Sequence, residues 1–182
     1  MKISGNFMPP SNLSLALSPA SARQTRDPFA SKFGAGSRFG MAADALIDSG
    51  AIVAILDKTD PWHRLCQDAI RQMHLPLLTS EAVLTEAFHF VGEAQSKMET
   101  AWKFIRSGVL VLGEIGHEEL PQVHALMSRY WDRPMDFADA TLVHLAKRES
   151  ISAILTIDHA DFSTYRIEGK RRFRVLPLER PR

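Results

Sequence analysis

Five short runs of apolar residues, separated by longer amphipathic stretches, constrain the fold of this chain most strongly. Such short continuous runs, in place of strict alternation, are typical of parallel strands that are buried on both faces. We therefore predict an α/β fold with a central parallel sheet of about five strands flanked by helices. The predicted strands are residues 45–48, 75–79, 109–112, 153–157 and 173–176.

The stretches between these runs predict helices. Pro61 suits the first turn of a helix, where its missing N–H does no harm. Ser80 and Asp136 are side chains that commonly cap the start of a helix. The predicted helices span residues 51–56, 61–73, 81–91, 95–106, 118–130 and 137–148.

Residues 1–40 differ in composition from residues 41–182, which carry the strand and helix pattern. The first segment is rich in Ser, Ala, Pro and Gly and has no lasting apolar period, so it is predicted to be disordered or a dispensable extension. A secretion signal within residues 13–22 and an organelle transit peptide are alternative interpretations. Residues 41–182 are predicted to form one domain.

The lone cysteine and the absence of long apolar runs indicate a cytoplasmic protein. Cys66 excludes an intramolecular disulfide and a multi-cysteine zinc site, fits a reducing compartment, and is predicted to be a core thiol. No apolar run approaches the roughly 18 residues that a membrane-spanning helix needs.

Acidic residues follow predicted strands or begin predicted helices. Asp48 and Asp158 stand behind two strands, and sites in open α/β sheets form at the carboxyl ends of strands. Asp136 and Asp139 share one helical turn, and Glu86 lies in the helix after the second strand. Clustered carboxylates repel one another and usually gather around a cation or a shared proton, so we predict a shared site.

Each acid also has a structural interpretation. Asp136 could cap a helix with Asp139 in its first turn, and Asp158 with Asp161 could organise a turn. Glu86 could be an exposed helix residue. The set as a whole, and not any one member, favours the shared site.

Basic residues are concentrated near the end of the chain. The segment 166–182 carries seven basic and two acidic side chains, which suits a polyanionic partner held near a cation site. A solvated charged tail is the alternative interpretation.

Four segments resemble, in order, the motifs of PIN-domain nucleases, especially the VapC-type toxins of bacterial toxin–antitoxin systems. The segments are residues 47–49, 84–86, 136–140 and 156–162. The resemblance implies a PIN-like three-layer sandwich, Mg²⁺- or Mn²⁺-dependent endoribonuclease activity on RNA, a homodimer, and a cognate antitoxin as partner.

The resemblance also assigns residues. It makes Asp48, Glu86, Asp139 and Asp158 the catalytic and metal-binding quartet. It gives auxiliary positions to Asp136, Asp161, Ser49 and Thr156. The family commonly has a basic residue where this chain has His159, which could contact RNA or belong to a turn. From their charge, the candidate RNA-binding residues are Arg166, Lys170, Arg171, Arg172 and Arg174.

An all-carboxylate site favours Mg²⁺ or Mn²⁺, which can activate a water molecule for attack on phosphorus. Two alternatives remain open. One is a phosphatase with Asp48 as nucleophile, although such enzymes generally have a second Asp where this chain has Gly50. The other is a non-catalytic domain that binds RNA or an antitoxin.

Overall fold

The computed structural model describes residues 43–133 and 135–181. The predictions for residues 1–40 lie outside the described residues and stay predictions. The strands are β1 (Ala45–Ile47), β2 (Leu77–Thr79), β3 (Leu110–Leu112), β4 (Ala153–Leu155), β5 (Arg166–Glu168), β6 (Arg171–Arg172) and β7 (Arg174–Leu176). The helices are α1 (Ser49–Leu56), α2 (His63–Arg71), α3 (Glu81–Val91), α4 (Gln95–Phe104), a π-helical turn (Ile105–Val109), a 3₁₀ turn (His117–Glu119), α5 (Leu120–Arg129), α6 (Phe137–Arg148) and α7 (His159–Thr164).

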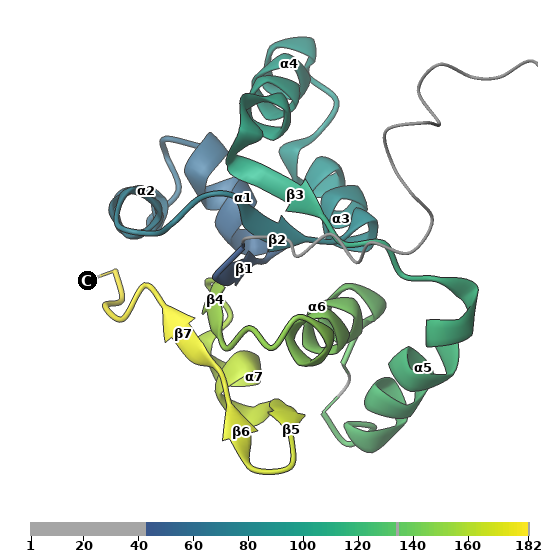
Figure 1. The fold of residues 1–182 in the computed structure, drawn as a ribbon. Helices are drawn as coiled ribbons and strands as arrows, with labels where there is room; N and C mark the ends of the chain where they lie inside the picture. Colours follow the sequence, from purple (N-terminus) through teal and green to yellow (C-terminus); the bar gives the residue numbers. More distant parts are fainter. Residues whose placement is uncertain (1–42, 134, 182) are drawn as a thin grey trace, which may run out of the picture. The chain divides into compact units, whose positions relative to one another are not determined.

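The predicted parallel sheet is confirmed. Its strand order is β3-β2-β1-β4-β7, and all four pairings are parallel. The chain builds the sheet outward from β1 in one direction and then returns to add β4 and β7 on the other side (Figure 1). The order therefore reverses between β1 and β4, which is where a crevice forms at the carboxyl ends of the strands.

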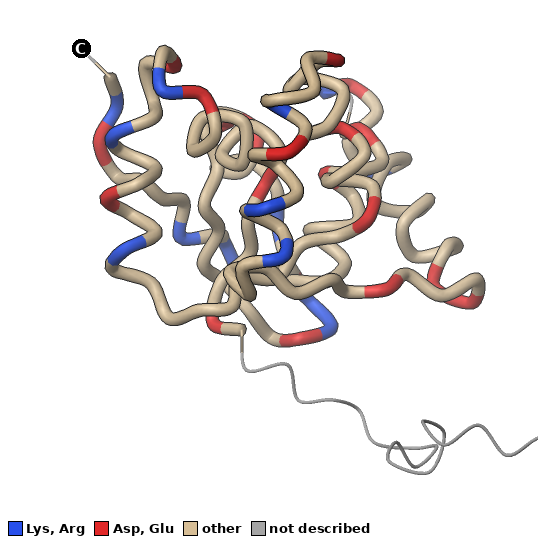
Figure 2. Tube along the Cα trace, turned by 90° about the horizontal axis from the view of Figure 1, so that it is seen from above, with Lys and Arg blue, Asp and Glu red and all other residues tan. Residues whose placement is uncertain are grey.

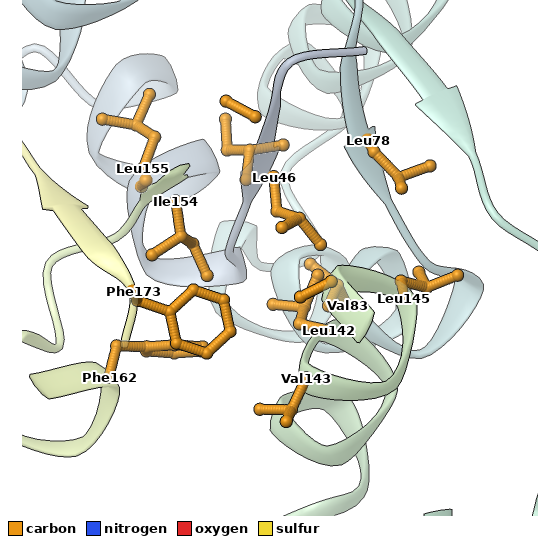
Figure 3. Packing of buried hydrophobic residues seen from close by; sticks show 14 of the residues in the cluster. Leu46, Leu78, Val83, Leu142, Val143, Leu145, Ile154, Leu155, Phe162 and Phe173 are labelled. Atoms are coloured by element: carbon orange, nitrogen blue, oxygen red, sulfur yellow. The ribbon is translucent and has the colours of Figure 1, made fainter. Parts of the chain in front are cut away.

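The core lies between the sheet and the helices. Leu46 and Ile154 are fully buried, and their strands pair in register. Leu142 and Leu145 of α6 pack beneath the sheet beside Val83 of α3 (Figure 3). Helix α2 lies on one face of the sheet and α6 on the other (Figure 1). Burial on both faces explains why the strands are continuous apolar runs.

Some predicted boundaries are wrong. The helix after Pro61 begins at His63, with Trp62 as its N-cap. The chain between β4 and β7 forms α7 and the antiparallel β5–β6 hairpin, neither of which was predicted. Arg172 therefore belongs to β6 and Arg174 to β7. The buried Phe173 lies between these two strands, where the chain passes from the hairpin into the main sheet.

The prediction of a core thiol is confirmed. Cys66 is buried and unpaired, and burial raises the pKa of its thiol to about 12, so it stays protonated near neutral pH. Every helix within the described residues is too short or too polar to cross a membrane.

Candidate active site

Two neighbouring strands deliver acidic residues to the same edge of the sheet. Asp48 follows β1 directly, and its backbone N–H donates a hydrogen bond to the Leu155 carbonyl at the end of β4 over 3.0 Å. Asp158 lies three residues beyond Leu155 and begins α7. The predicted positions of both acids at the carboxyl edge are therefore found in the structure, at the reversal of strand order.

Asp48 is a buried carboxylate with two fixed hydrogen bonds. It is only 7% exposed, and it accepts hydrogen bonds from the Ser49 N–H at 2.6 Å and the Thr156 hydroxyl at 2.8 Å. Burial, with smaller contributions from the charges of Glu86 and Asp136, raises the pKa of Asp48 to about 6 despite these donors. The carboxylate is thus oriented by the fold but lacks a compensating positive charge.

Asp139 is perturbed more strongly. It lies in the first turn of α6 and accepts a hydrogen bond from the Tyr165 hydroxyl at 3.0 Å. Burial is the main cause that raises the pKa of Asp139 to about 8, and the charges of Asp136, Asp48 and Asp158 add to it. Each of these carboxylates is therefore close enough to act on Asp139, as expected for one shared acidic site.

Glu86 completes the set from a different element. It is half-buried on α3, which packs against both α1 and α6. Its charge contributes to the raised pKa of Asp48, so it lies near the β1 end of the site. The structure thus places Glu86 near Asp48, and Asp48 and Asp158 near Asp139.

The structural interpretation of the other acids is also correct. Asp136 caps α6 by accepting a hydrogen bond from the Asp139 N–H at 2.8 Å. Asp158 caps α7 by accepting one from the Asp161 N–H at 3.0 Å. Burial, followed by the charge of Asp158, raises the pKa of Asp161. Capping and membership of the acidic site are therefore compatible, because each cap leaves carboxylate lone pairs unused.

Thr156 links the two strand-end acids. Its hydroxyl donates to Asp48 Oδ2 and accepts a hydrogen bond from the Asp158 N–H at 2.9 Å. This is the geometry expected of a residue that orients a carboxylate. Ser49 donates a hydrogen bond to Asp48 through its backbone N–H.

The donor set fits a hard divalent cation. Among the described residues, no three His, Cys, Asp or Glu side chains stand in a ready-made ligand arrangement. Mg²⁺ keeps several waters and is commonly held by one or two carboxylates, so it does not need such a cage. The pKa values of Asp48 and Asp139 are raised mainly by burial and further by neighbouring carboxylates, and a bound cation would offset both effects.

The basic tail divides into parts with different surroundings. Arg174 pairs with Ala153 at the amino end of β4, and the Arg171 guanidinium donates to the Ser150 carbonyl. Both lie at the edge of the sheet opposite Asp158. The Arg166 guanidinium donates to carbonyls at the end of α7, at 3.0 Å for Ser163.

RNA binding by Arg166, Lys170, Arg171, Arg172 and Arg174 therefore stays a prediction. Basic and acidic positions are interspersed along the trace (Figure 2). The structure adds a basic residue that the sequence reasoning missed. Arg133 lies 3.6 Å from Asp161 and donates to Thr164 at 3.0 Å. Tyr165 was also missed, because only the fold brings it to Asp139.

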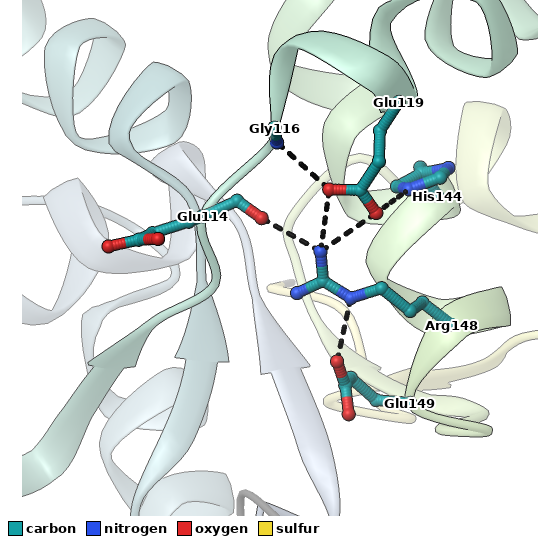
Figure 4. Close-up of polar contacts among 6 residues, drawn as sticks. All are labelled: Glu114, Gly116, Glu119, His144, Arg148 and Glu149. Carbon is teal, nitrogen blue, oxygen red and sulfur yellow. Dashed lines mark hydrogen bonds and ion pairs between the residues drawn. The ribbon is translucent and has the colours of Figure 1, made fainter. Parts of the chain in front are cut away.

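A second polar cluster lies at the other end of α6 (Figure 4). Glu119 accepts hydrogen bonds from His144 at 2.8 Å and from Arg148 at 3.0 Å, and its Oε2 accepts one from the Gly116 N–H at 2.9 Å. Burial alone would raise the pKa of Glu119, but these donors outweigh it and lower the pKa to about 2. Every charge in this cluster has an opposite partner, so it has the character of a structural ion-pair network.

Comparisons with known proteins agree with this geometry. The PIN domain family model matches residues 45–168. Ribonuclease VapC26 of Mycobacterium tuberculosis is 30% identical over 135 residues, which is 72% of this chain and 99% of that protein. The crystal structure of VapC20 of the same organism, a toxin described as cleaving the sarcin–ricin loop, superposes with a TM-score of 0.61 at 17% identity. That match covers 70% of this chain and 98% of VapC20, and at this identity it shows the fold alone.

Proposed function

The chain belongs to the PIN-domain family, and on this premise we propose that it is a divalent-metal-dependent endoribonuclease that hydrolyses RNA phosphodiester bonds. The observation that supports the proposal is the grouping of Asp48 and Asp158 with Asp139, and of Glu86 with Asp48, together with the raised pKa values of Asp48 and Asp139. Ribonuclease activity in a relative that is aligned over nearly its whole length supports it. We propose residues 41–182 as the PIN domain and residues 1–40 as a dispensable extension.

We propose that the quartet holds Mg²⁺ or Mn²⁺, with Asp136 and Asp161 as auxiliary acids. When bound, such an ion would lower the pKa of a water molecule and stabilise charge on the leaving oxygen. Perturbed carboxylates also occur without catalysis, so activity on RNA and not the pKa is the deciding measurement.

The side chains around the quartet prepare it for this role. Thr156 donates to Asp48 and favours its ionised form, while Tyr165 does the same for Asp139. Because the Thr156 hydroxyl also accepts from the Asp158 N–H, the strand ends of β1 and β4 are held at a fixed separation. The protein thus fixes the carboxylates before any ion or RNA binds.

We propose a biological role as the toxin of a toxin–antitoxin pair, with a cognate antitoxin that inhibits it and a homodimer as the assembled form. This role follows the VapC names of the relatives and the motif resemblance.

The test uses purified full-length chain and an end-labelled single-stranded RNA. We expect internal cleavage with Mg²⁺ or Mn²⁺, complete loss of cleavage in excess chelator, and products with 5′-phosphate and 3′-hydroxyl ends. Full activity in chelator would overturn metal dependence. Release of terminal phosphate with intact internal linkages would instead support the phosphatase alternative, and binding without cleavage would support the non-catalytic one.

A further inference from the structure

An open pocket of about 310 Å³ adjoins the acidic site at Asp158. Trp62 forms one wall from the start of α2, and Ile157 to Ala160 form the floor. Arg180 reaches it from the segment that follows the carboxyl end of β7. Three separate parts of the chain therefore meet beside one acid of the quartet. The proposed metal chemistry of the quartet gives no role to the other residues of this pocket.

Two aromatic rings line this pocket. The rings of Trp62 and His159 are 5.1 Å apart between centroids, with an interplanar angle of 39°. His159 Nε2 is buried and has no hydrogen-bond partner within the described chain, so packing against Trp62, and not polar contact, positions the imidazole. Trp62 itself packs on the core and is only half-buried. A rigid aromatic surface with an exposed part suits stacking by a flat ligand.

Arg180 gives the pocket a positive charge. Its side chain is exposed, and it forms no ion pair with any residue in 43–133 or 135–181. The guanidinium is close enough for its charge to act on the His159 ring. A guanidinium can bind a phosphate oxygen through paired N–H groups or stack on a base.

We propose that Trp62, His159 and Arg180 form a subsite for one nucleotide of single-stranded RNA, next to the bond that is cleaved. The base stacks on Trp62 beside His159, and Arg180 contacts the adjoining phosphate. The inference rests on the proposed ribonuclease function, because Asp158 belongs to both the pocket and the quartet. Every base has a π-face, so the subsite selects unpaired over paired RNA more than one base over another.

The test measures RNA affinity separately from cleavage. The full chain carries Asp48→Asn to prevent cleavage, and binding of a dye-labelled single-stranded RNA is followed by fluorescence anisotropy. Trp62→Ala in this background should weaken binding about tenfold, since loss of one base stack costs about 1–3 kcal/mol and 1.4 kcal/mol is tenfold. Arg180→Ala should weaken it severalfold and flatten its salt dependence by about one phosphate contact.

A scan of abasic positions along the RNA locates the stack. With the Asp48→Asn parent, one abasic position should lose about tenfold in affinity. In Trp62→Ala that same position should no longer matter, because the stacking partner is already gone. A flat abasic profile in the parent would overturn the subsite without any pocket variant being needed.

Matched controls exist for both residues. Trp102 of α4 packs against Phe88 of α3, with 5.0 Å between the ring centroids. Arg71 is an exposed cation at the carboxyl end of α2. Trp102→Ala and Arg71→Ala should bind RNA like the parent. Arg180 is exposed, so Arg180→Ala tests the subsite even if Trp62→Ala fails to fold.

The two proposals fail in different ways. If the wild-type chain cleaves RNA but Trp62→Ala and Arg180→Ala keep the parent's affinity, the subsite is wrong and the ribonuclease function stands. If the wild-type chain neither binds nor cleaves RNA, both are overturned.

Discussion

The two ends of α6 carry polar clusters of opposite character. At its start, Asp136 and Asp139 lie among other carboxylates, and burial with like charge raises the pKa of Asp139 to about 8. At its end, His144 and Arg148 meet Glu119, whose pKa falls to about 2 under its hydrogen bonds although burial opposes this. Both arrangements suit the helix dipole, which favours anions at the N-terminus and cations at the C-terminus.

The two clusters differ in how their charges are compensated. The Glu119 cluster balances its charges internally and fixes α5 and the preceding turn to α6. The Asp139 cluster leaves charge unbalanced, which costs stability in the folded chain. Such a cost in the folded chain is consistent with the proposed cation site. Four predictions test this difference between the two clusters.

The largest expected effect is on catalysis. Asp48→Asn or Asp139→Asn should each reduce RNA cleavage by more than about 100-fold, because loss of a ligand should exceed the 10–100-fold typical of outer-shell changes. Metal-free thermal stability should hold or rise, since each substitution removes a carboxyl group whose ionised form is disfavoured by burial and like charge.

The matched control is Glu119→Gln, which removes a carboxylate beside the same helix. It should keep cleavage yet lower the free energy of unfolding by about 1–3 kcal/mol, because the uncharged Gln side chain offers one acceptor oxygen in place of two to His144, Arg148 and the Gly116 N–H. Near-wild-type cleavage by both Asp48→Asn and Asp139→Asn would refute the site assignment.

A smaller effect on cleavage is expected from the loss of the Thr156 hydroxyl, which joins the ends of β1 and β4. Thr156→Val should reduce cleavage about 10- to 100-fold and move the rise of the pH–rate profile to higher pH, because Asp48 loses a donor that favours its ionised form. Thr156→Ser should restore both. A Val variant with reduced rate but an unshifted profile would limit Thr156 to packing.

Stability should respond to pH in opposite ways at the two clusters. Asp139 has a folded-state pKa of about 8, above its ordinary 3.8, so its stabilising protonated form is lost as pH rises through about 8. Glu119 has a lowered pKa, so its contribution is present above 4.5 and is lost only as pH falls through about 2.

Urea unfolding in chelator tests this directly. The wild-type chain should lose about 2 kcal/mol relative to Asp139→Asn between about pH 5 and pH 8.5, after allowance for solvent screening. Glu119→Gln should keep the wild-type slope over that range. Parallel curves for the wild-type chain and Asp139→Asn would show that Asp139 titrates normally.

The smallest expected effect is on RNA binding and concerns the arginine side chains. Arg133→Ala, beside Asp161, should reduce the salt dependence of RNA binding by about one phosphate contact. The double variant Arg172→Ala/Arg174→Ala should reduce it by about two if both predicted RNA-binding residues contact phosphate. Anisotropy against salt measures both. An unchanged slope in the double variant would assign Arg172 and Arg174 to protein contacts or solubility.

The sequence by itself determined the layered fold and the identity of the acids. Short apolar runs such as residues 45–47 and 153–155 are local signals of strands buried on both faces, and the acid that follows each run marks the carboxyl edge. Caps such as Ser80 and Asp136 are equally local and were predicted correctly.

Only the tertiary structure decided which side chains surround those acids. Tyr165 reaches Asp139 across 26 positions, and Thr156 reaches Asp48 across 108, so no spacing rule connects them. The β5–β6 hairpin was missed because its strands are too short and polar to form an apolar pattern. Partners of this kind depend on strand order and helix packing, which a single chain's periodicity does not encode.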